Sequence, residues 1–112
     1  MPLPMHVRHD VERKLIAYCT RRVPKQLRKQ VKAAFKIRGN AVTLFEDREH
    51  FLHKSRWIQI PIAQFRFQGS YWTLYCPDRN SKWHRYPLAS PSKQLDVLIA
   101  EVEENPIGMF TT

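Results

Sequence analysis

Residues 62–87 constrain the fold most, because they hold two alternating apolar runs with a turn signal between them. Gly69-Ser70 separates the runs and is typical of a two-residue hairpin loop. Counting outward from that loop predicts the pairs Gln68–Tyr71, Phe67–Trp72, Arg66–Thr73, Phe65–Leu74, Gln64–Tyr75 and Ala63–Cys76. Since side chains alternate along a strand, one face of this hairpin is apolar, and the other carries Arg66, Tyr71 and Tyr75.

A second hairpin is predicted around Gly39-Asn40. In residues 31–38 apolar side chains alternate with mostly basic ones, which indicates a half-buried strand with a basic outer face. The same counting predicts the pairs Ile37–Val42, Phe35–Leu44, Ala33–Glu46, Lys36–Thr43, Ala34–Phe45 and Lys32–Asp47. The last of these would be exposed and worth at most ~1 kcal/mol, so it indicates register more than stability.

The flanking segments predict two helices. In residues 4–22 an apolar stripe recurs at helical spacing: Val7, Val11, Leu15, Tyr18 and Cys19. This helix should end at Val23-Pro24, before a short helical turn in residues 25–30. Ser90-Pro91 is typical of a helix start, and the second helix has an apolar stripe of Leu95, Leu98, Ile99 and Val102, an acidic outer face and an end near Asn105.

Between these elements, residues 46–55 are predicted to form a loop, and Pro61 suggests a bulge or an edge strand. The segment PDRNSK should turn the chain into a last strand at residues 83–86. The whole therefore predicts an α+β protein, a single domain over residues 1–112. Its antiparallel β-meander of about five strands should have an N-terminal and a C-terminal helix packed on one face.

The net charge of +9 is concentrated in one part of the chain. Residues 1–38 contain 11 Lys and Arg against 2 Asp and Glu, whereas residues 39–112 contain 8 of each. A segment with so much charge produces a directional potential, which favours an anionic partner. The alternatives are a solvated face and a surface that pairs with the acidic second helix.

Several site classes find little support in the sequence. No run approaches the ~18 apolar residues of a membrane span and the N-terminus lacks a signal-peptide pattern, so a cytoplasmic protein without membrane contact is expected. Cys19 and Cys76 lack CxxC spacing and are interpreted as reduced core thiols. His50 and His53 lack further ligands at suitable spacing, so neither a metal nor a cofactor is predicted.

Three segments carry a family resemblance: VTLFEDR at residues 42–48, AQFRF at 63–67 and WTLYCPDRNSKWHRY at 72–86. With the NPIGMF near the C-terminus, they resemble a family of small bacterial proteins described as a domain of unknown function. The sequence departs from that pattern at Cys76, where an aromatic residue is usual, and at Thr111-Thr112, which replace Trp-Gly. The resemblance implies a cytosolic bacterial single-domain protein and supplies no catalytic residues.

The function that these patterns favour is non-enzymatic binding of nucleic acid, RNA or DNA, through the basic segment of residues 21–38 and an aromatic and basic sheet face. Phosphates bind to cations, and unpaired bases stack on flat side chains, each stacked base being worth ~1–3 kcal/mol. The candidate residues are Arg21, Arg22, Lys25, Arg28, Lys29, Lys32, Lys36, Arg66, Tyr71, Tyr75, Trp83 and Arg85. The alternative for the aromatic residues is ordinary cross-strand pairing. A three-residue loop, residues 79–81, would place Trp83 and Arg85 on the open face of the sheet with His84 and Tyr86 inside, and avoids burying Arg85.

Two other functions remain open. A small metal-independent ribonuclease would draw on Glu46, Arg48, Asp78, Arg79, His84 and Tyr86, although no spacing joins these residues into a site and Asp78 and Asn80 are typical turn residues. A protein-interaction module or homodimer would use the open sheet face or an edge strand. No catalytic residue is assigned.

Overall fold

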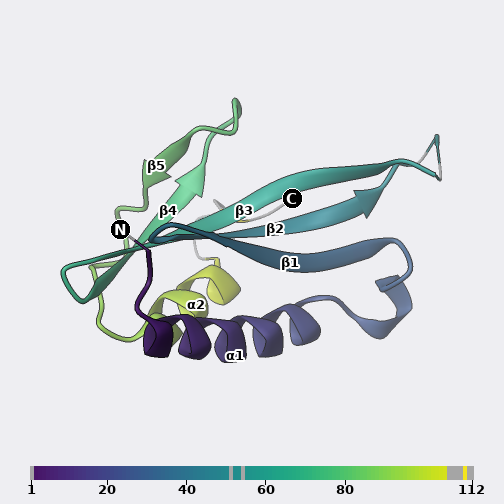
Figure 1. The fold of residues 1–112 in the computed structure, drawn as a ribbon. Coiled ribbons are helices and arrows are strands. Elements are labelled where there is room, and N and C mark those ends of the chain that lie inside the picture. The colour runs from purple at the N-terminus through teal and green to yellow at the C-terminus, as the bar shows by residue number, and fades with distance from the viewer. Residues whose placement is uncertain (1, 51, 54, 106–109, 111–112) are drawn as a thin grey trace.

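The computed structural model describes residues 2–50, 52–53, 55–105 and 110. Within these residues two helices lie on one side of a five-stranded antiparallel sheet (Figure 1). The helices are α1 (Met5–Arg22) and α2 (Leu95–Glu104), and a 3₁₀ turn, η1 (Lys25–Leu27), follows α1. The strands are β1 (Val31–Arg38), β2 (Ala41–Glu49), β3 (Trp57–Gln68), β4 (Tyr71–Pro77) and β5 (Trp83–Arg85), and they are neighbours in this order. The predicted α+β meander is confirmed.

Helix α1 begins after Pro4 and ends at Val23, whose extended backbone (φ −102°, ψ 118°) is the conformation that the following proline favours. Of the predicted stripe, Val11, Leu15 and Tyr18 are buried, and the other two members pack against the core as partly buried residues. The 3₁₀ turn after Pro24 confirms the predicted short helical segment.

Both hairpins have the registers that counting predicts. All six pairs of the β1–β2 hairpin are present, and five of the six in the β3–β4 hairpin. The β3–β4 ladder ends at Gln64–Tyr75, so Ala63–Cys76 is not a pair of this ladder, although both residues are buried in the core. Gly69 and Ser70 have φ of +58° and +71°, as a type I′ turn requires.

A bulge in β3 joins the two hairpins. Leu44 lies opposite Ala63, whereas Phe45 lies opposite Pro61, so Ile62 is an extra residue. Both Ile62 and Ala63 are therefore buried in the core, and the alternation of β3 changes phase between them. The bulge predicted at Pro61 is confirmed, and β3 is an interior strand of this sheet rather than an edge.

Two element boundaries differ from prediction. The loop predicted at residues 46–55 is wrong for residues 46–49, because β2 continues to Glu49 and the charged Glu46 is buried with arginine partners. Helix α2 begins at Leu95 rather than Pro91, because Ser92 exchanges backbone hydrogen bonds of 2.7 and 2.9 Å with Trp72 and holds the preceding segment extended. The predicted apolar stripe of α2 is buried, and the helix ends at Asn105 in the left-handed conformation (φ 48°).

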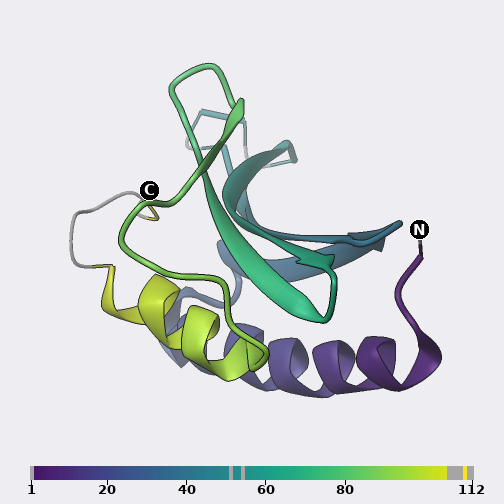
Figure 2. The same cartoon turned by 90° about the vertical axis from the view of Figure 1, so that its left-hand side faces the viewer.

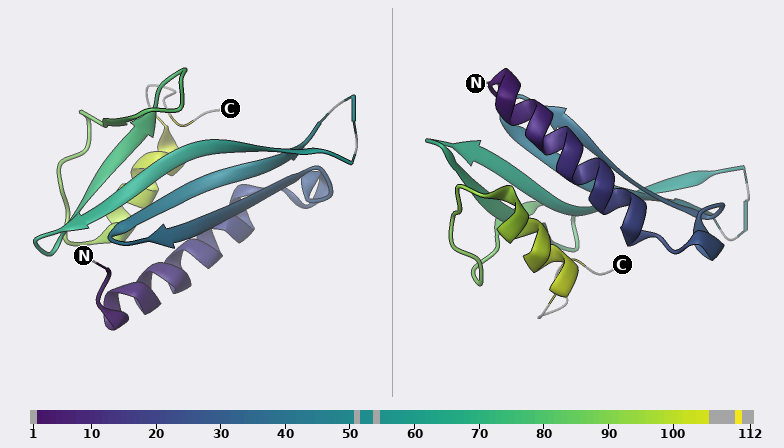
Figure 3. Two further views of the ribbon diagram at one scale, coloured as in Figure 1. Left: turned by 45° about the horizontal axis from the view of Figure 1, so that its top comes forward. Right: turned by 90° about the horizontal axis from the view of Figure 1, so that it is seen from below.

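The two helices cover one face of the sheet and leave the other uncovered by helix (Figures 2 and 3). The sheet is strongly twisted and curled, so that β4 and β5 turn away from the helix layer (Figure 2). The core lies between the helices and the inner sheet face. We call the opposite side the open face; its side chains include Lys32, Lys36, Thr43, Phe45, Gln64, Arg66, Tyr75 and Arg85.

Candidate nucleic-acid interface

One row of side chains crosses all five strands on the open face. Lys36 lies opposite Thr43, which lies opposite Gln64; Gln64 in turn lies opposite Tyr75, and Tyr75 opposite Arg85. The two end residues are exposed, whereas Gln64 at the centre is 9% exposed although the helices lie on the other face. Since neighbouring strands are about 4.8 Å apart, the row spans about 19 Å along the sheet. It presents a cation at each end and hydrogen-bonding groups between them.

At the centre of this face, the Arg66 guanidinium is stacked on the Tyr75 ring. Its Cζ lies 3.8 Å from the ring centroid, and its Nε donates a 2.6 Å hydrogen bond to Gln64 Oε1. Gln64 is itself fixed, because its Nε2 donates to Thr43 Oγ1 at 3.0 Å. In the described part of the chain neither Nη of Arg66 has a hydrogen-bond partner. The guanidinium is thus held against the Tyr75 ring by the hydrogen bond at its Nε, and its two Nη groups are available to a ligand.

Three more cation–aromatic contacts lie on or beside the open face. The ammonium of Lys36 lies 5.3 Å from the Phe45 ring centroid and that of Lys32 lies 5.0 Å from the Trp57 ring centroid. A third ammonium, Lys93, lies 5.5 Å from the Tyr71 ring centroid. The Lys32–Asp47 register is as predicted, but the charge of Lys32 is over an aromatic ring.

Carboxylates on the open face are confined to one end of the sheet. Among the described residues of this face they are Asp47 and Glu49, which lie opposite Gln59 and Trp57 near the end of β2. Around the Arg66–Tyr75 stack the charged groups are cations: Lys36, Arg38, Arg66 and Arg85. This end of the face therefore has a positive potential, which no carboxylate among its described residues neutralises.

The twelve predicted site residues divide into two groups. Lys32, Lys36, Arg66, Tyr75, Trp83 and Arg85 lie on the open face, with Tyr71 at its margin opposite Gln68. Arg21, Arg22, Lys25, Arg28 and Lys29 lie at the end of α1 and in the turn that follows it. The charge run of residues 21–38 is therefore divided between the end of α1 with its turn and the open face, although Arg28 and Lys32 line one hollow.

Within the second group, α1 cations have partners elsewhere in the protein. Arg21 of this group forms a 3.2 Å ion pair with Glu103, and Lys14, which lies earlier on α1 and outside the group, forms one of 3.3 Å with Asp96. These contacts confirm that cations of the first helix face the acidic second helix. Arg28 donates a 3.2 Å hydrogen bond from Nη2 to the carbonyl oxygen of Thr20.

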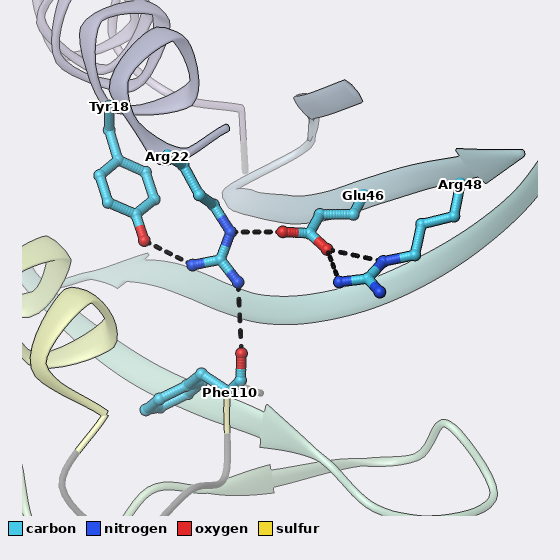
Figure 4. A network of polar contacts seen from close by, with 5 residues as sticks. All are labelled: Tyr18, Arg22, Glu46, Arg48 and Phe110. Carbon is cyan, nitrogen blue, oxygen red and sulfur yellow. Dashed lines mark hydrogen bonds and ion pairs between the residues drawn. The ribbon is translucent and has the colours of Figure 1, made fainter. Parts of the chain in front are cut away.

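Arg22 belongs to a buried polar network on the helix side of the sheet (Figure 4). Its Nε lies 2.7 Å from Glu46 Oε2, and its Nη1 donates to the Tyr18 hydroxyl at 2.7 Å. Arg48 donates from Nε and Nη2 to Glu46 Oε1 at 3.1 and 2.8 Å. Burial favours the neutral acid, but the hydrogen bonds from the two arginines more than offset it, so the pKa of Glu46 lies below its ordinary value. Arg22 therefore stabilises the fold and is not available as a ligand group.

The residues of the ribonuclease alternative lie in separate places. Glu46 belongs to the buried network, and Tyr86 is fully buried with its hydroxyl donating to Glu101 at 3.2 Å. Asp78 and His84 do meet, at 2.7 Å, in the β4–β5 turn. Hydrogen bonds from the Lys82 amide and the His84 ring hold the pKa of Asp78 at about 2, so Asp78 is a turn-capping residue, as predicted.

The register of this turn resolves the position of the last strand. Tyr75 lies opposite Arg85 and Pro77 opposite Trp83, as the three-residue loop requires. Tyr86 is inside, as predicted. The prediction that His84 is inside is wrong: its side chain is 62% exposed, because β5 is a short edge strand and the ring turns back to Asp78.

The remaining candidate groups have structural roles. Cys19 and Cys76 are free thiols, and burial raises the pKa of both, that of Cys19 to about 11, so neither is a ready nucleophile at neutral pH. His50 Nδ1 accepts hydrogen bonds from the amides of Leu52 and His53. In the described ranges no three His, Cys, Asp or Glu side chains are grouped to hold a metal ion. Nor does any helix there have the length and apolar character needed to cross a membrane.

Sequence reasoning missed three members of the interface. Gln64 and Thr43 fix the Arg66 guanidinium. They are joined by the pairing of β2 with β3, and the bulge in β3 shifts this register by one residue, so it cannot be obtained by counting from a turn. Lys93 reaches Tyr71 only because the segment before α2 forms a bridge with Trp72. The signal available for Gln64 and Thr43 was their place on the polar faces of the two predicted hairpins.

Comparison with known proteins places the chain in a family. No curated protein and no solved structure matches it. One family model matches residues 3–112, which is nearly the full length and includes every element of the fold. The chain therefore belongs to the family described as a domain of unknown function, DUF3024.

Proposed function

We propose that the open face binds single-stranded nucleic acid, RNA or DNA, and catalyses no reaction on it. The observation that carries this proposal is the Arg66 guanidinium, which is stacked on Tyr75 and held by Gln64. Both partners belong to the row that has Lys36 and Arg85 at its ends. In the described part of this face, no carboxylate lies near the stack.

The chemistry of the stack fits an unpaired nucleotide. A guanidinium plane supports a base by stacking, and the Nη edge donates to a phosphate or a base edge. Exposed cations at the two ends of the row can contact further phosphates. A duplex hides the faces of its bases inside the stack, so this surface favours a single strand.

Fluorescence anisotropy with labelled 12-nucleotide RNA and DNA of mixed sequence tests the proposal. At 50 mM NaCl we expect saturable binding that weakens steeply as salt is added, because phosphate contacts release counterions. Arg85→Glu should weaken binding at least tenfold. The matched control is Arg13→Glu, because Arg13 is 75% exposed on α1 and its substitution makes the same charge change on the helix side of the protein. Absence of binding to single or double strands, or an equal loss in both variants, contradicts the proposal.

Two further readouts separate this function from the alternatives. RNA cleavage that persists in a chelator and is lost in His84→Ala would assign the protein to the ribonucleases. A doubled mass in light scattering that does not depend on salt would assign the open face or an edge to a dimer.

A further inference from the structure

Strand β1 is an edge of the sheet, and one set of its backbone groups points away from β2. The Glu49 amide donates to the Gln30 carbonyl oxygen at 2.8 Å, and Arg38–Ala41 closes the two-residue turn. Both contacts mark hydrogen-bonded pairs of an antiparallel ladder, in which bonded and non-bonded pairs alternate. The amide and carbonyl groups that point outward are therefore those of Val31, Ala33, Phe35 and Ile37. In the described part of the chain no other strand pairs with this edge.

An apolar hollow lies beside this edge, between α1 and β1. It has a volume of about 320 Å³ and is lined by Ile16, Cys19 and Thr20 of α1 and residues 33–35 of β1. A second hollow of about 410 Å³ shares part of this lining and adds Val23, Arg28, Val31 and Lys32. Ile16 is 59% exposed and lies outside the stripe that α1 packs on the core. The side chains of an added strand thus have an apolar place to pack.

The edge is also strongly basic. Arg28 lies in the hollow, and the exposed Lys32, Lys36 and Arg38 follow β1 on the open face. In the described part of the chain no ion pair involves these four residues. A second copy that paired its own β1 here would bring like charges together, which opposes that arrangement. Charge complementarity instead favours an acidic partner.

We propose that the β1 edge binds an acidic peptide in extended conformation, which adds a sixth strand to the sheet. Peptide residues opposite Val31, Ala33 and Phe35 exchange backbone hydrogen bonds with them and direct apolar side chains into the α1–β1 hollow. The alternate peptide residues lie on the other face beside Lys32 and Lys36, and acidic side chains there pair with the two ammonium groups. This site shares Lys36 with the row on the open face but does not include the Arg66–Tyr75 stack.

A nine-residue fluorescent peptide that alternates valine and glutamate, measured by anisotropy, tests the proposal. The key variant is Ala33→Pro, because it removes an amide that points outward and bonds no residue of β2, and proline is tolerated at such edge positions. We expect saturable binding to the native protein that is at least tenfold weaker in Ala33→Pro. Thermal unfolding followed by circular dichroism checks that the variant is folded. The control Arg13→Glu should bind as the native protein does.

Two more measurements keep the proposal falsifiable if Ala33→Pro does not fold. Lys32→Glu with Lys36→Glu should weaken binding at least tenfold, and peptide added to the native protein should shift the amide resonances of residues 31–37. A matched peptide of valine and lysine should not bind. The proposal is overturned by absent binding at millimolar peptide, by equal binding of the lysine peptide, or by amide shifts centred on Arg66 and Tyr75. A doubled mass that Ala33→Pro reduces to the monomer also overturns it, since a second copy would then occupy the edge.

Discussion

Arg22 and Arg66 are half-buried arginines on opposite faces of one sheet, and their partners differ. Arg22 meets a carboxylate, Glu46, at 2.7 Å in the network beneath the sheet. Arg66 meets a ring, Tyr75, with its Cζ 3.8 Å from the centroid, and a neutral amide, Gln64. The carboxylate of Glu46 neutralises the charge of Arg22, whereas the ring and the amide leave the charge of Arg66 in place.

This difference separates structural cations from candidate ligand groups more clearly than charge counting does. A buried ion pair satisfies both partners, and removing one partner leaves an uncompensated charge. A guanidinium stacked on an aromatic ring is oriented without being neutralised. The fold and the candidate interface therefore depend on different arginines, which substitutions can separate.

The largest effect on stability should follow Glu46→Ala. Arg22, with 17% of its side chain exposed, would lose its carboxylate partner, and breaking a pair this buried costs about 3 kcal/mol. Urea denaturation at pH 7 measures the change in the free energy of unfolding. The control is Glu103→Ala, whose pair with Arg21 is half exposed and worth about 0.5 kcal/mol. Equal losses in the two variants would contradict the structural role of the network.

On the open face, Arg66→Ala should weaken RNA binding about tenfold, or about 1.4 kcal/mol, within the range for one stacked base. Arg66→Lys keeps the charge but loses the plane, so it should weaken binding several-fold. Anisotropy at one fixed salt concentration measures both. Arg22→Lys is the matched control, and it should lower stability without changing affinity. Full recovery of affinity in Arg66→Lys would show that charge alone matters.

The registers of the two hairpins could be predicted because each rests on two independent signals, a turn and an alternation that agree across it. Gly69-Ser70 and Gly39-Asn40 fix the counting, and the alternation assigns the faces. Residues such as Arg66 and Tyr75 were placed on the open face in this way. Hairpin register and the assignment of side chains to a face could therefore be predicted, because both depend on local sequence pattern alone.

Contacts between distant segments could not be predicted in the same way. The pairing of Arg22 with Glu46 depends on how α1 lies across the sheet, which no period in the sequence encodes. Trp57 comes under Lys32 only through the register beyond the Pro61 bulge. The basic residues of the 21–38 segment were predicted to form one site, but in the folded protein they lie at the end of α1, in the turn that follows it and on the open face.

A smaller effect is expected from pH. The pKa of Glu46 is lowered below 4.5 in the folded protein, so its contribution to stability is complete above that value and is lost as pH falls through the lower folded pKa. Unfolding in urea at pH 7, 4.5 and 3 should show this loss. Glu46→Gln should lose less stability over the same range, because glutamine does not titrate. It should still lose some, because Asp10 and Asp78, whose pKa values are also lowered, titrate in both proteins. Parallel curves would assign the acid sensitivity to other carboxylates.

The smallest effect should follow Lys36→Ala, at the β1 end of the row that Arg66 adjoins. Lys36 is exposed and its ammonium lies over the ring of Phe45, a contact worth about 0.5 kcal/mol of stability. If Lys36 contacts one phosphate, its loss should also reduce the salt slope of RNA binding by about 0.7, as expected for a single strand. Urea denaturation and a salt titration of affinity measure the two quantities. A loss of stability as large as that of Glu46→Ala would mean that the cations of the open face support the fold as Arg22 does, and the contrast between the two faces would fail.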